Sequence, residues 1–267
     1  MRILLFSLVS FFLLFTACES VTTETEGSVE TPPAPAPIAI GAPEKSPAEL
    51  VLDQAIAAHS SGKYDEAHYQ FVFREKTYTF HNDEGSYTYT LTHEKDGAAH
   101  FDQLVNGEFS RMIDGKAVSL TAKETASGTE GLNSVIYFAT LPHKLSDPAV
   151  NLQHAGTNTI KGETYDVLEV NFNKEGGGVD HDDNFRYWIN QATHRIDFLA
   201  YDYLTSGGGV RFRSAYNPRV VDGVLFQDYI NYKAPTGTPL ADLAAMFDKD
   251  ELEELSVIAT EEIVSIK

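Results

Sequence analysis

The stretch from Tyr165 to Tyr232 constrains the fold most, because it has the pattern of several β-strands joined by short turns. Its segments are rich in aromatic and β-branched residues, and Gly, Asn, Asp or Thr bounds each of them, which is typical of strands and turns. Asp222-Gly223 can supply the positive φ angles of a tight hairpin. The pattern predicts an antiparallel meander with strands at 165–172, 184–190, 195–203, 210–216 and 224–232.

This meander brings two glycine-rich loops to one end of the sheet. If every connection is a hairpin, loops 173–183 and 204–209 lie at the same end. Glycines at 176–178 and 207–209 permit left-handed angles or the close approach of another group. Two loops that are merely mobile would have the same composition.

Charged residues next to these glycines form a candidate functional rim. Side chains two residues apart on a strand share a face, so the two arginines after the second loop converge. The aspartates that end the first loop would face them. The rim, a candidate ligand-binding or catalytic site, comprises Asp180, His181, Asp182, Asp183, Arg211 and Arg213.

The rim also has the donor atoms of a cation site. Asp180, Asp182 and Asn184 match the opening of an oxygen-rich calcium loop. Phe185 stands where an EF-hand needs Gly and Gln191 where it needs Glu, so an EF-hand is excluded and a looser Ca²⁺ site stays open. The alternative is an aspartate-rich turn paired with the arginines. No other cofactor is indicated.

His181 has a second interpretation, as a general base oriented by a neighbouring carboxylate. The chain has no Gly-x-Ser-x-Gly elbow and no His-Glu-x-x-His motif, so serine-based acyl transfer and zinc proteolysis lack their usual signals. Enzymatic activity is therefore left open.

The N-terminal segment resembles a lipoprotein export signal. Arg2 precedes an apolar run from Ile3 to Phe15, and the run ends in Thr16-Ala17-Cys18. This ending is similar to the bacterial lipobox, in which the cysteine is lipidated. We expect residues 1–17 to be a signal peptide and Cys18 to carry the membrane anchor. Cys18 is the only cysteine, so no disulfide within the chain is possible.

The remaining chain divides into a linker and one folded domain. Residues 18–47 are rich in Pro, Thr and Glu, a composition typical of disorder, and we expect a single domain at 48–267. Ser46-Pro47-Ala48-Glu49 predicts a helix start, and His59 is expected as a cation in that helix's last turn.

Further strands and helices are expected on both sides of the meander. One strand is predicted over 68–80, another at 86–93, and a hairpin at Asn106-Gly107. A helix of two to three turns is expected within 129–145, packed into the concavity of the sheet. A helix is predicted over residues 240–255 from their helical period, and a final strand is predicted over residues 256–266. The residues expected at the concavity are His143, Arg186, Tyr187 and Trp188. For His143 the alternative is a role as a helix cap.

The net charge excludes one large class of partners. The chain carries −19 at pH 7, whereas nucleic-acid binding depends on basic residues that meet phosphates. We therefore expect no nucleic-acid partner. The expected partners are a membrane, through the acyl anchor at Cys18, and a lipid or other small ligand.

Several motifs together resemble a known family. They are Asn133-Ser134-Val135, Tyr187-Trp188, Leu199-Ala200-Tyr201, the two glycine runs with their charged neighbours, and Asp228-Tyr229-x-Asn231-Tyr232. They resemble an uncharacterised family of envelope lipoproteins of the Bacteroidetes, covering about residues 48–267. Some members carry an automatic label of deoxyribose-phosphate aldolase, but that chemistry needs a Schiff-base lysine on a (β/α)₈ barrel, and this chain has hairpins without alternating helices.

The layout of the chain is also similar, at the level of the fold, to the half-barrels of lipoprotein carriers. The expected fold is mainly β (α+β): a curved antiparallel sheet or half-barrel, with an N-terminal helix and an internal helix in the concavity. The expected function is that of a lipid-anchored protein of the cell envelope, at the outer membrane, that binds a hydrophobic or amphipathic ligand in this concavity. The alternatives are an enzyme or metal-binding protein with its polar site at the rim, and a structural or partner-binding envelope protein.

Overall fold

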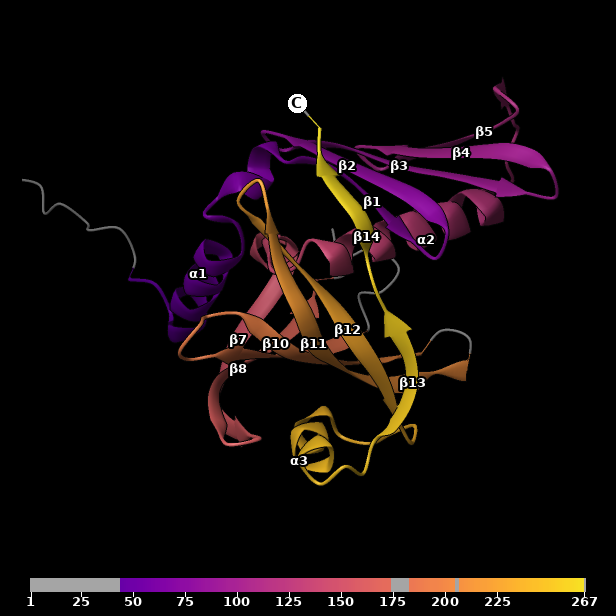
Figure 1. The fold of residues 1–267 in the computed structure, drawn as a ribbon. Helices are drawn as coiled ribbons and strands as arrows, with labels where there is room; N and C mark the ends of the chain where they lie inside the picture. The colour runs from indigo at the N-terminus through magenta and orange to yellow at the C-terminus, as the bar shows by residue number, and fades with distance from the viewer. Residues whose placement is uncertain (1–43, 174–182, 205–206, 267) are drawn as a thin grey trace, which may run out of the picture. The chain divides into compact units, whose positions relative to one another are not determined.

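Two curved antiparallel sheets, each built largely from consecutive hairpins, form the fold (Figure 1). The computed structural model describes residues 44–173, 183–204 and 207–266. In these residues the fold is mainly β with few helices, and the predicted fold class is confirmed.

Sheet A contains the first six strands of the described chain and one strand from the C-terminal region. Within the described residues its order is β14-β1-β2-β3-β4-β5-β6. The strands are β1 (His68–Phe73), β2 (Lys76–Asp83), β3 (Ser86–Lys95), β4 (Ala98–Val105), β5 (Glu108–Ile113), β6 (Lys116–Ala117) and β14 (Glu261–Ser265).

Sheet B contains the predicted meander, and its five predicted strands are confirmed. Its order over the described residues is β13-β12-β11-β10-β9-β8-β7. The strands are β7 (Val150–Ile160), β8 (Glu163–Phe172), β9 (Asn184–Asn190), β10 (Ile196–Tyr203), β11 (Gly209–Val221), β12 (Val224–Ala234) and β13 (Glu253–Ile258).

Helix α1 (Pro47–Ser60) begins where its sequence predicts. The Ser46 hydroxyl accepts a hydrogen bond from the backbone N–H of Glu49, and the Glu49 carboxylate accepts one from the Ser46 N–H. This reciprocal pair satisfies two of the N–H groups that a helix leaves free at its start. In the described part of the chain, no helix has both the length and the apolar character needed to cross a membrane.

His59 does not have the predicted role of a charged helix cap. Its side chain is buried, and Nε2 accepts a hydrogen bond from the backbone N–H of Ile196 at 3.1 Å. Burial, with a smaller contribution from Arg195, lowers the pKa of His59 to about 4. The ring is therefore neutral near pH 7 and serves as an acceptor that fixes α1 to the start of β10.

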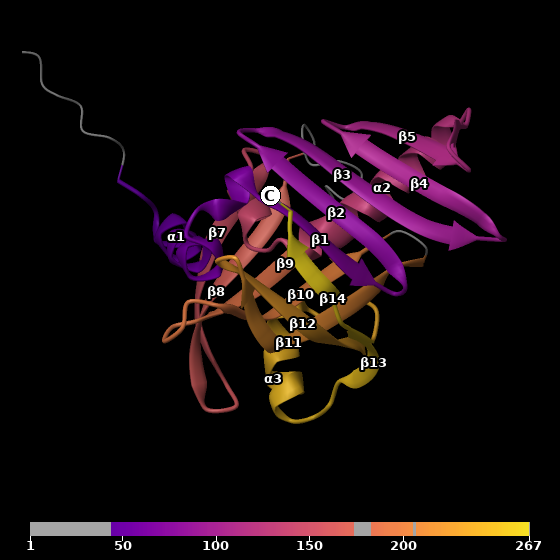
Figure 2. The ribbon, with the colours of Figure 1, turned by 45° about the horizontal axis from the view of Figure 1, so that its top comes forward.

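Helix α2 (Ala122–Ala139) lies between the two sheets and is longer than predicted. It begins with a capping box formed by Thr121 and Glu124. Its Leu132 and Ile136 pack into the core cluster of sheet A, whereas Tyr137 and Phe138 pack against a cluster of sheet B. Figures 1 and 2 both show α2 running along the strands of sheet A.

Three other boundaries differ from the predictions. The single strand expected over 68–80 is a hairpin, β1–β2, whose turn residues Arg74 and Glu75 have φ of 50° and 61°. The helix expected over 240–255 is reduced to a 3₁₀ turn at Leu240–Asp242 and the short α3 (Leu243–Asp248). The final strand is divided into β13 in sheet B and β14 in sheet A, so this segment links the two sheets.

Candidate functional site

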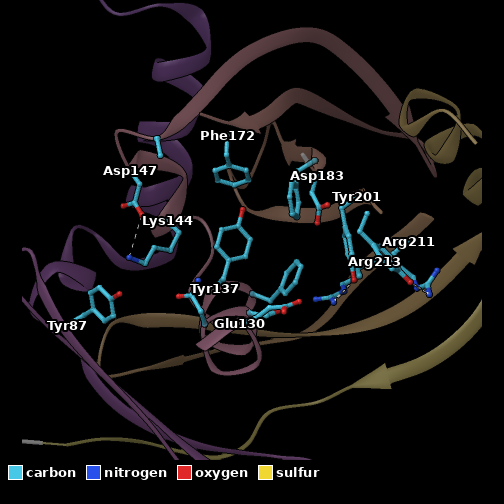
Figure 3. A pocket seen from close by; sticks show the side chains of 16 residues that line it. Tyr87, Glu130, Tyr137, Lys144, Asp147, Phe172, Asp183, Tyr201, Arg211 and Arg213 are labelled. Carbon is cyan, nitrogen blue, oxygen red and sulfur yellow. Dashed lines mark hydrogen bonds and ion pairs between the residues drawn. The ribbon is translucent and has the colours of Figure 1, made fainter. Parts of the chain in front are cut away.

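A cavity of about 540 Å³ lies between α2 and the concave face of sheet B, and we call it the main cavity. Its walls come from α2, the segment after α2, and strands β8 to β11, and Tyr87 of β3 in sheet A closes one end. Figure 3 shows Tyr137 and Phe172 in its middle, the pair Arg211 and Arg213 at one end, and Lys144 at the other. The volume is within the range of ~300–1,000 Å³ that is common for sites of small ligands.

Aromatic side chains form one continuous wall of the main cavity. The centroids of Phe172 and Phe185 are 5.7 Å apart in an edge-to-face contact, and those of Phe138 and Tyr201 are 5.3 Å apart. Tyr137 contacts Phe185 at 5.9 Å. Such ring pairs hold their geometry and offer a broad apolar surface.

The Tyr137 hydroxyl is hydrogen-bonded to a residue that lies outside the lining of the main cavity. It is 2.7 Å from the hydroxyl of Tyr187, which is fully buried in β9. Burial raises the pKa of both tyrosines, so both hydroxyls stay protonated at neutral pH. The pair fixes the position of α2 against sheet B and supplies no charge.

Arg213 is the charged residue most enclosed by the main cavity's walls. Only 8% of its surface is exposed. Its Cζ lies 3.8 Å from the centroid of Phe138, and Nη2 donates to the Tyr201 hydroxyl at 2.9 Å. Within the described residues it forms no ion pair. A buried cation is costly unless an anion or several acceptors compensate it.

Arg211 lies two residues before Arg213 on β11, as the strand period predicts. Its Nη2 donates to the Tyr203 hydroxyl at 2.5 Å, and its Nη1 donates to the Val210 carbonyl. A Cβ atom on Gly209 would lie 2.6 Å from that tyrosine hydroxyl and 2.9 Å from Arg211 Nη1. The last glycine of this run therefore permits the close packing of Tyr203 with Arg211.

The other end of the main cavity is polar and mixed in charge. Lys144 Nζ is 3.6 Å from an Asp147 carboxylate oxygen and 5.5 Å from the centroid of Tyr87. Glu130 of α2 also lines the cavity. The positive charge of Lys144 is thus partly balanced by a neighbour, in contrast with that of Arg213.

The structure brings three of the six rim residues to one cavity. Asp183 lines the main cavity together with Arg211 and Arg213. Asp180, His181 and Asp182 lie outside the described residues. The flanks of the two loops do lie at one end of sheet B, because Asn184 pairs with Asp202 and Gly209 pairs with Tyr203.

The proposed cation donors are only partly described. Asn184 donates from its backbone N–H and from Nδ2 to Oδ1 of Asp202, both at 3.1 Å. Among the described residues there is no group of three or more His, Cys, Asp or Glu side chains that could hold a metal ion. Asp180 and Asp182 fall outside this set, so the calcium hypothesis stays a hypothesis.

The four residues expected at the concavity are not in the lining of the main cavity. Trp188 lies on the opposite face of β9, where its cluster includes α3 residues and Nε1 donates to Asn158 Oδ1 at 2.8 Å. Arg186 shares that face and pairs with Glu169 at 2.9 Å. Tyr187 lies on the face of β9 that packs against α2, but it is outside the lining of the cavity. His143 lies beside Tyr64, and their ring centroids are 5.2 Å apart. The alternation of β9 places Phe185 in the lining instead.

Most of the aromatic wall was not identified from the sequence as part of a site. Tyr137 and Phe138 are adjacent on α2, and only the packing of the helix against sheet B makes them lining residues. Phe185 lies two residues before the predicted Tyr187 and shares its face of β9, but the strand period does not say which of the two faces lines a cavity.

Comparisons with known proteins identify one matching family and several similar solved structures. Residues 53–260 match the family of unknown function DUF6503. A LolA superfamily protein from Nitrosomonas europaea is similar with 11% identity, a TM-score of 0.47, and coverage of 82% of this chain and 94% of that one. A DUF1329 family protein from Desulfovibrio piger has 12% identity, a TM-score of 0.42, and coverage of 83% and 94%. No curated protein matches the chain.

Proposed function

The chain belongs to the DUF6503 family of unknown function, and from this premise we propose that it binds a small anionic amphiphile in the main cavity. The acid group of the ligand lies against Arg213 and Arg211. Its hydrocarbon part lies along the aromatic wall. A fatty acid is the simplest molecule of this class.

The observation that carries this proposal is the environment of Arg213. Its guanidinium is almost fully enclosed, stacks on Phe138, and has no ion-pair partner within the described residues. An anionic ligand would supply the missing charge in a site of low dielectric constant, where charge-assisted hydrogen bonds are strong. The adjacent aromatic side chains supply the apolar surface.

The cellular setting belongs to the same proposal. The apolar N-terminal run and the sequence before Cys18 support export and lipidation of the protein, with residues 18–47 as a linker and 48–267 as the ligand-binding domain. An anchor at the outer membrane would place the cavity near a source of amphiphiles. Replacing Cys18 with Ser should abolish incorporation of labelled fatty acid, and continued labelling of Cys18→Ser would remove the anchor from the proposal.

Polar chemistry at the rim is a second candidate function. The observation in its favour is that Asp183, Arg211 and Arg213 line one cavity, which is an arrangement that can bind or activate a polar substrate. A cation held by Asp180, Asp182 and Asn184 would extend this site.

The primary test compares an acid with its neutral analogue. We expect decanoate to bind the purified protein and Arg213→Gln to weaken it by about tenfold or more, because a hydrogen bond to a charged group is worth ~1.5–3 kcal/mol. Binding of 1-decanol should change much less, because it lacks the anion. Arg213→Lys keeps the charge and should retain an intermediate affinity for decanoate.

Arg186→Gln is the matched control, since it removes a positive charge from the opposite face of sheet B. It should leave the decanoate affinity unchanged. Thermal melts of all variants establish that each is folded. Equal losses for decanoate and 1-decanol in Arg213→Gln, or a larger loss in Arg186→Gln, would refute the proposed site.

A further inference from the structure

A second cavity, of about 210 Å³, adjoins the main cavity at the end of α2. The larger, apolar part of its walls comes from Phe71 of β1, Val135 and Ala139 of α2, Tyr229 of β12, and Ile258 of β13. Polar side chains, among them Gln227 and Asn231 of β12, form the rest. It therefore lies where α2 meets β1 of sheet A and strands β11 to β13 of sheet B.

The two cavities share the residues that would hold the ligand's head group. Ser134, Phe138 and Arg213 line both of them. The Arg213 guanidinium lies 3.8 Å from the Phe138 ring centroid, so this stacked pair forms part of the boundary between the cavities. An acid group bound at Arg213 would have the aromatic wall of the main cavity on one side and the second cavity on another.

We propose that the ligand is a branched amphiphile, whose second, short hydrocarbon arm leaves the chain next to the acid group and occupies the second cavity. The inference rests on the proposed function, because the arm is placed by a head group at Arg213. The small volume of the second cavity limits this arm to a few carbons, while the main cavity accommodates the longer one. The site would thus distinguish branched from straight-chain acids.

Two acids with the same eight-carbon main chain test this inference. 2-Butyloctanoate carries a butyl arm next to its carboxylate, whereas octanoate is unbranched. Each methylene moved from water into an apolar site contributes roughly fourfold in affinity. We expect 2-butyloctanoate to bind at least about tenfold more tightly than octanoate, since the two acids share the chain in the main cavity and only the branched acid buries an arm in the second cavity.

Ala139→Leu tests whether the second cavity causes this preference. Ala139 lines the second cavity and is absent from the lining of the main cavity, so a leucine there would fill the space meant for the arm. The preference for the branched acid should disappear. Ala126→Leu, the same exchange at an exposed position of α2, should keep it, and Ile258→Phe fills the cavity from β13 if Ala139→Leu does not fold.

The outcomes separate the inference from the proposed function. Equal affinities for the two acids in the unaltered protein, or a preference that survives both cavity-filling variants, would overturn the inference while the binding of acids at Arg213 stands. If neither acid binds, or if Arg213→Gln leaves the affinity of both unchanged, the proposed function fails and the inference fails with it.

Discussion

His59 provides a sharp test of the structure because the two interpretations of this residue predict opposite effects of acid. In the structure the neutral ring accepts a hydrogen bond from the Ile196 N–H, and burial lowers its pKa to about 4. In the unfolded chain the pKa returns to about 6.5. Between these values the unfolded chain binds a proton that the folded protein does not, so stability falls as the pH falls.

The size of the effect follows from the two pKa values. Between pH 7 and about pH 4.5, His59 should remove ~2 kcal/mol from the free energy of unfolding. A cation at the end of α1 would instead gain stability from the helix dipole on acidification. Carboxylates also titrate in this range, so only a difference between variants isolates the histidine.

The assay is urea unfolding of the unaltered protein and of His59→Gln at both pH values. Gln keeps a distal acceptor for the Ile196 N–H and does not titrate. The unaltered protein should lose ~2 kcal/mol more than His59→Gln on acidification. Equal losses, or a smaller loss in the unaltered protein, would refute the assignment of a buried neutral histidine.

Three other perturbations have outcomes set by particular contacts, each measured by chemical or thermal unfolding. A Cβ on Gly128 of α2 would lie 2.3 Å from Cζ of Phe109, whereas one on Gly131 would meet nothing within 4 Å. Gly131→Ala should therefore raise the free energy of unfolding by up to ~1 kcal/mol, and Gly128→Ala should be the less stable variant of the two. Equal stabilities of the two variants would count against the contact with Phe109. Asp228 is buried and accepts hydrogen bonds from Arg219 Nη2 and the Thr260 N–H, both at 2.9 Å. Asp228→Ala should therefore lower the free energy of unfolding by ~3 kcal/mol. A decrease of less than ~1 kcal/mol would show that these hydrogen bonds are dispensable for stability. For the calcium hypothesis at the rim, a hundredfold excess of Ca²⁺ over its dissociation constant should stabilise the protein by ~2.7 kcal/mol, and identical melts in calcium and in chelator would exclude the site.

Local turn chemistry made much of the fold predictable. Asn106-Gly107 and Asp222-Gly223 both have positive φ at each residue and close hairpins where expected. The turn at Arg74-Glu75 was missed because neither residue type favours left-handed angles. The pairing of β1 with β2 on either side of the turn offsets that local cost.

The errors at α2 and in the C-terminal region have a different cause. The first turns of α2 are mostly exposed and polar, so they lack the apolar period that marks a helix in a sequence. Glu253 and Glu254 begin β13, which is an edge strand, and charges are common there because they discourage pairing with another chain. Acidic residues that resemble a solvated helix thus belong to a strand.

The candidate site was predictable only where it follows a strand period. The neighbouring arginines of β11 could be placed on one face from their spacing. The aromatic wall could not, because Tyr137 and Phe138 become lining residues only when α2 packs against sheet B. Assigning Trp188 to the concavity required knowledge of which face of β9 the helix covers, and the alternation alone does not supply it.

The division of the last strands between the two sheets has a consequence for the order of folding. β14 pairs with β1, so that Tyr69 lies opposite Ser265, and these residues are separated by most of the folded chain. During synthesis from the N-terminus, one edge of β1 therefore stays unpaired until residues 261–265 have been made. Such distant pairing is slow to form, and open edges promote aggregation. The nascent protein should therefore be most prone to aggregation before its last strand is available to pair with β1.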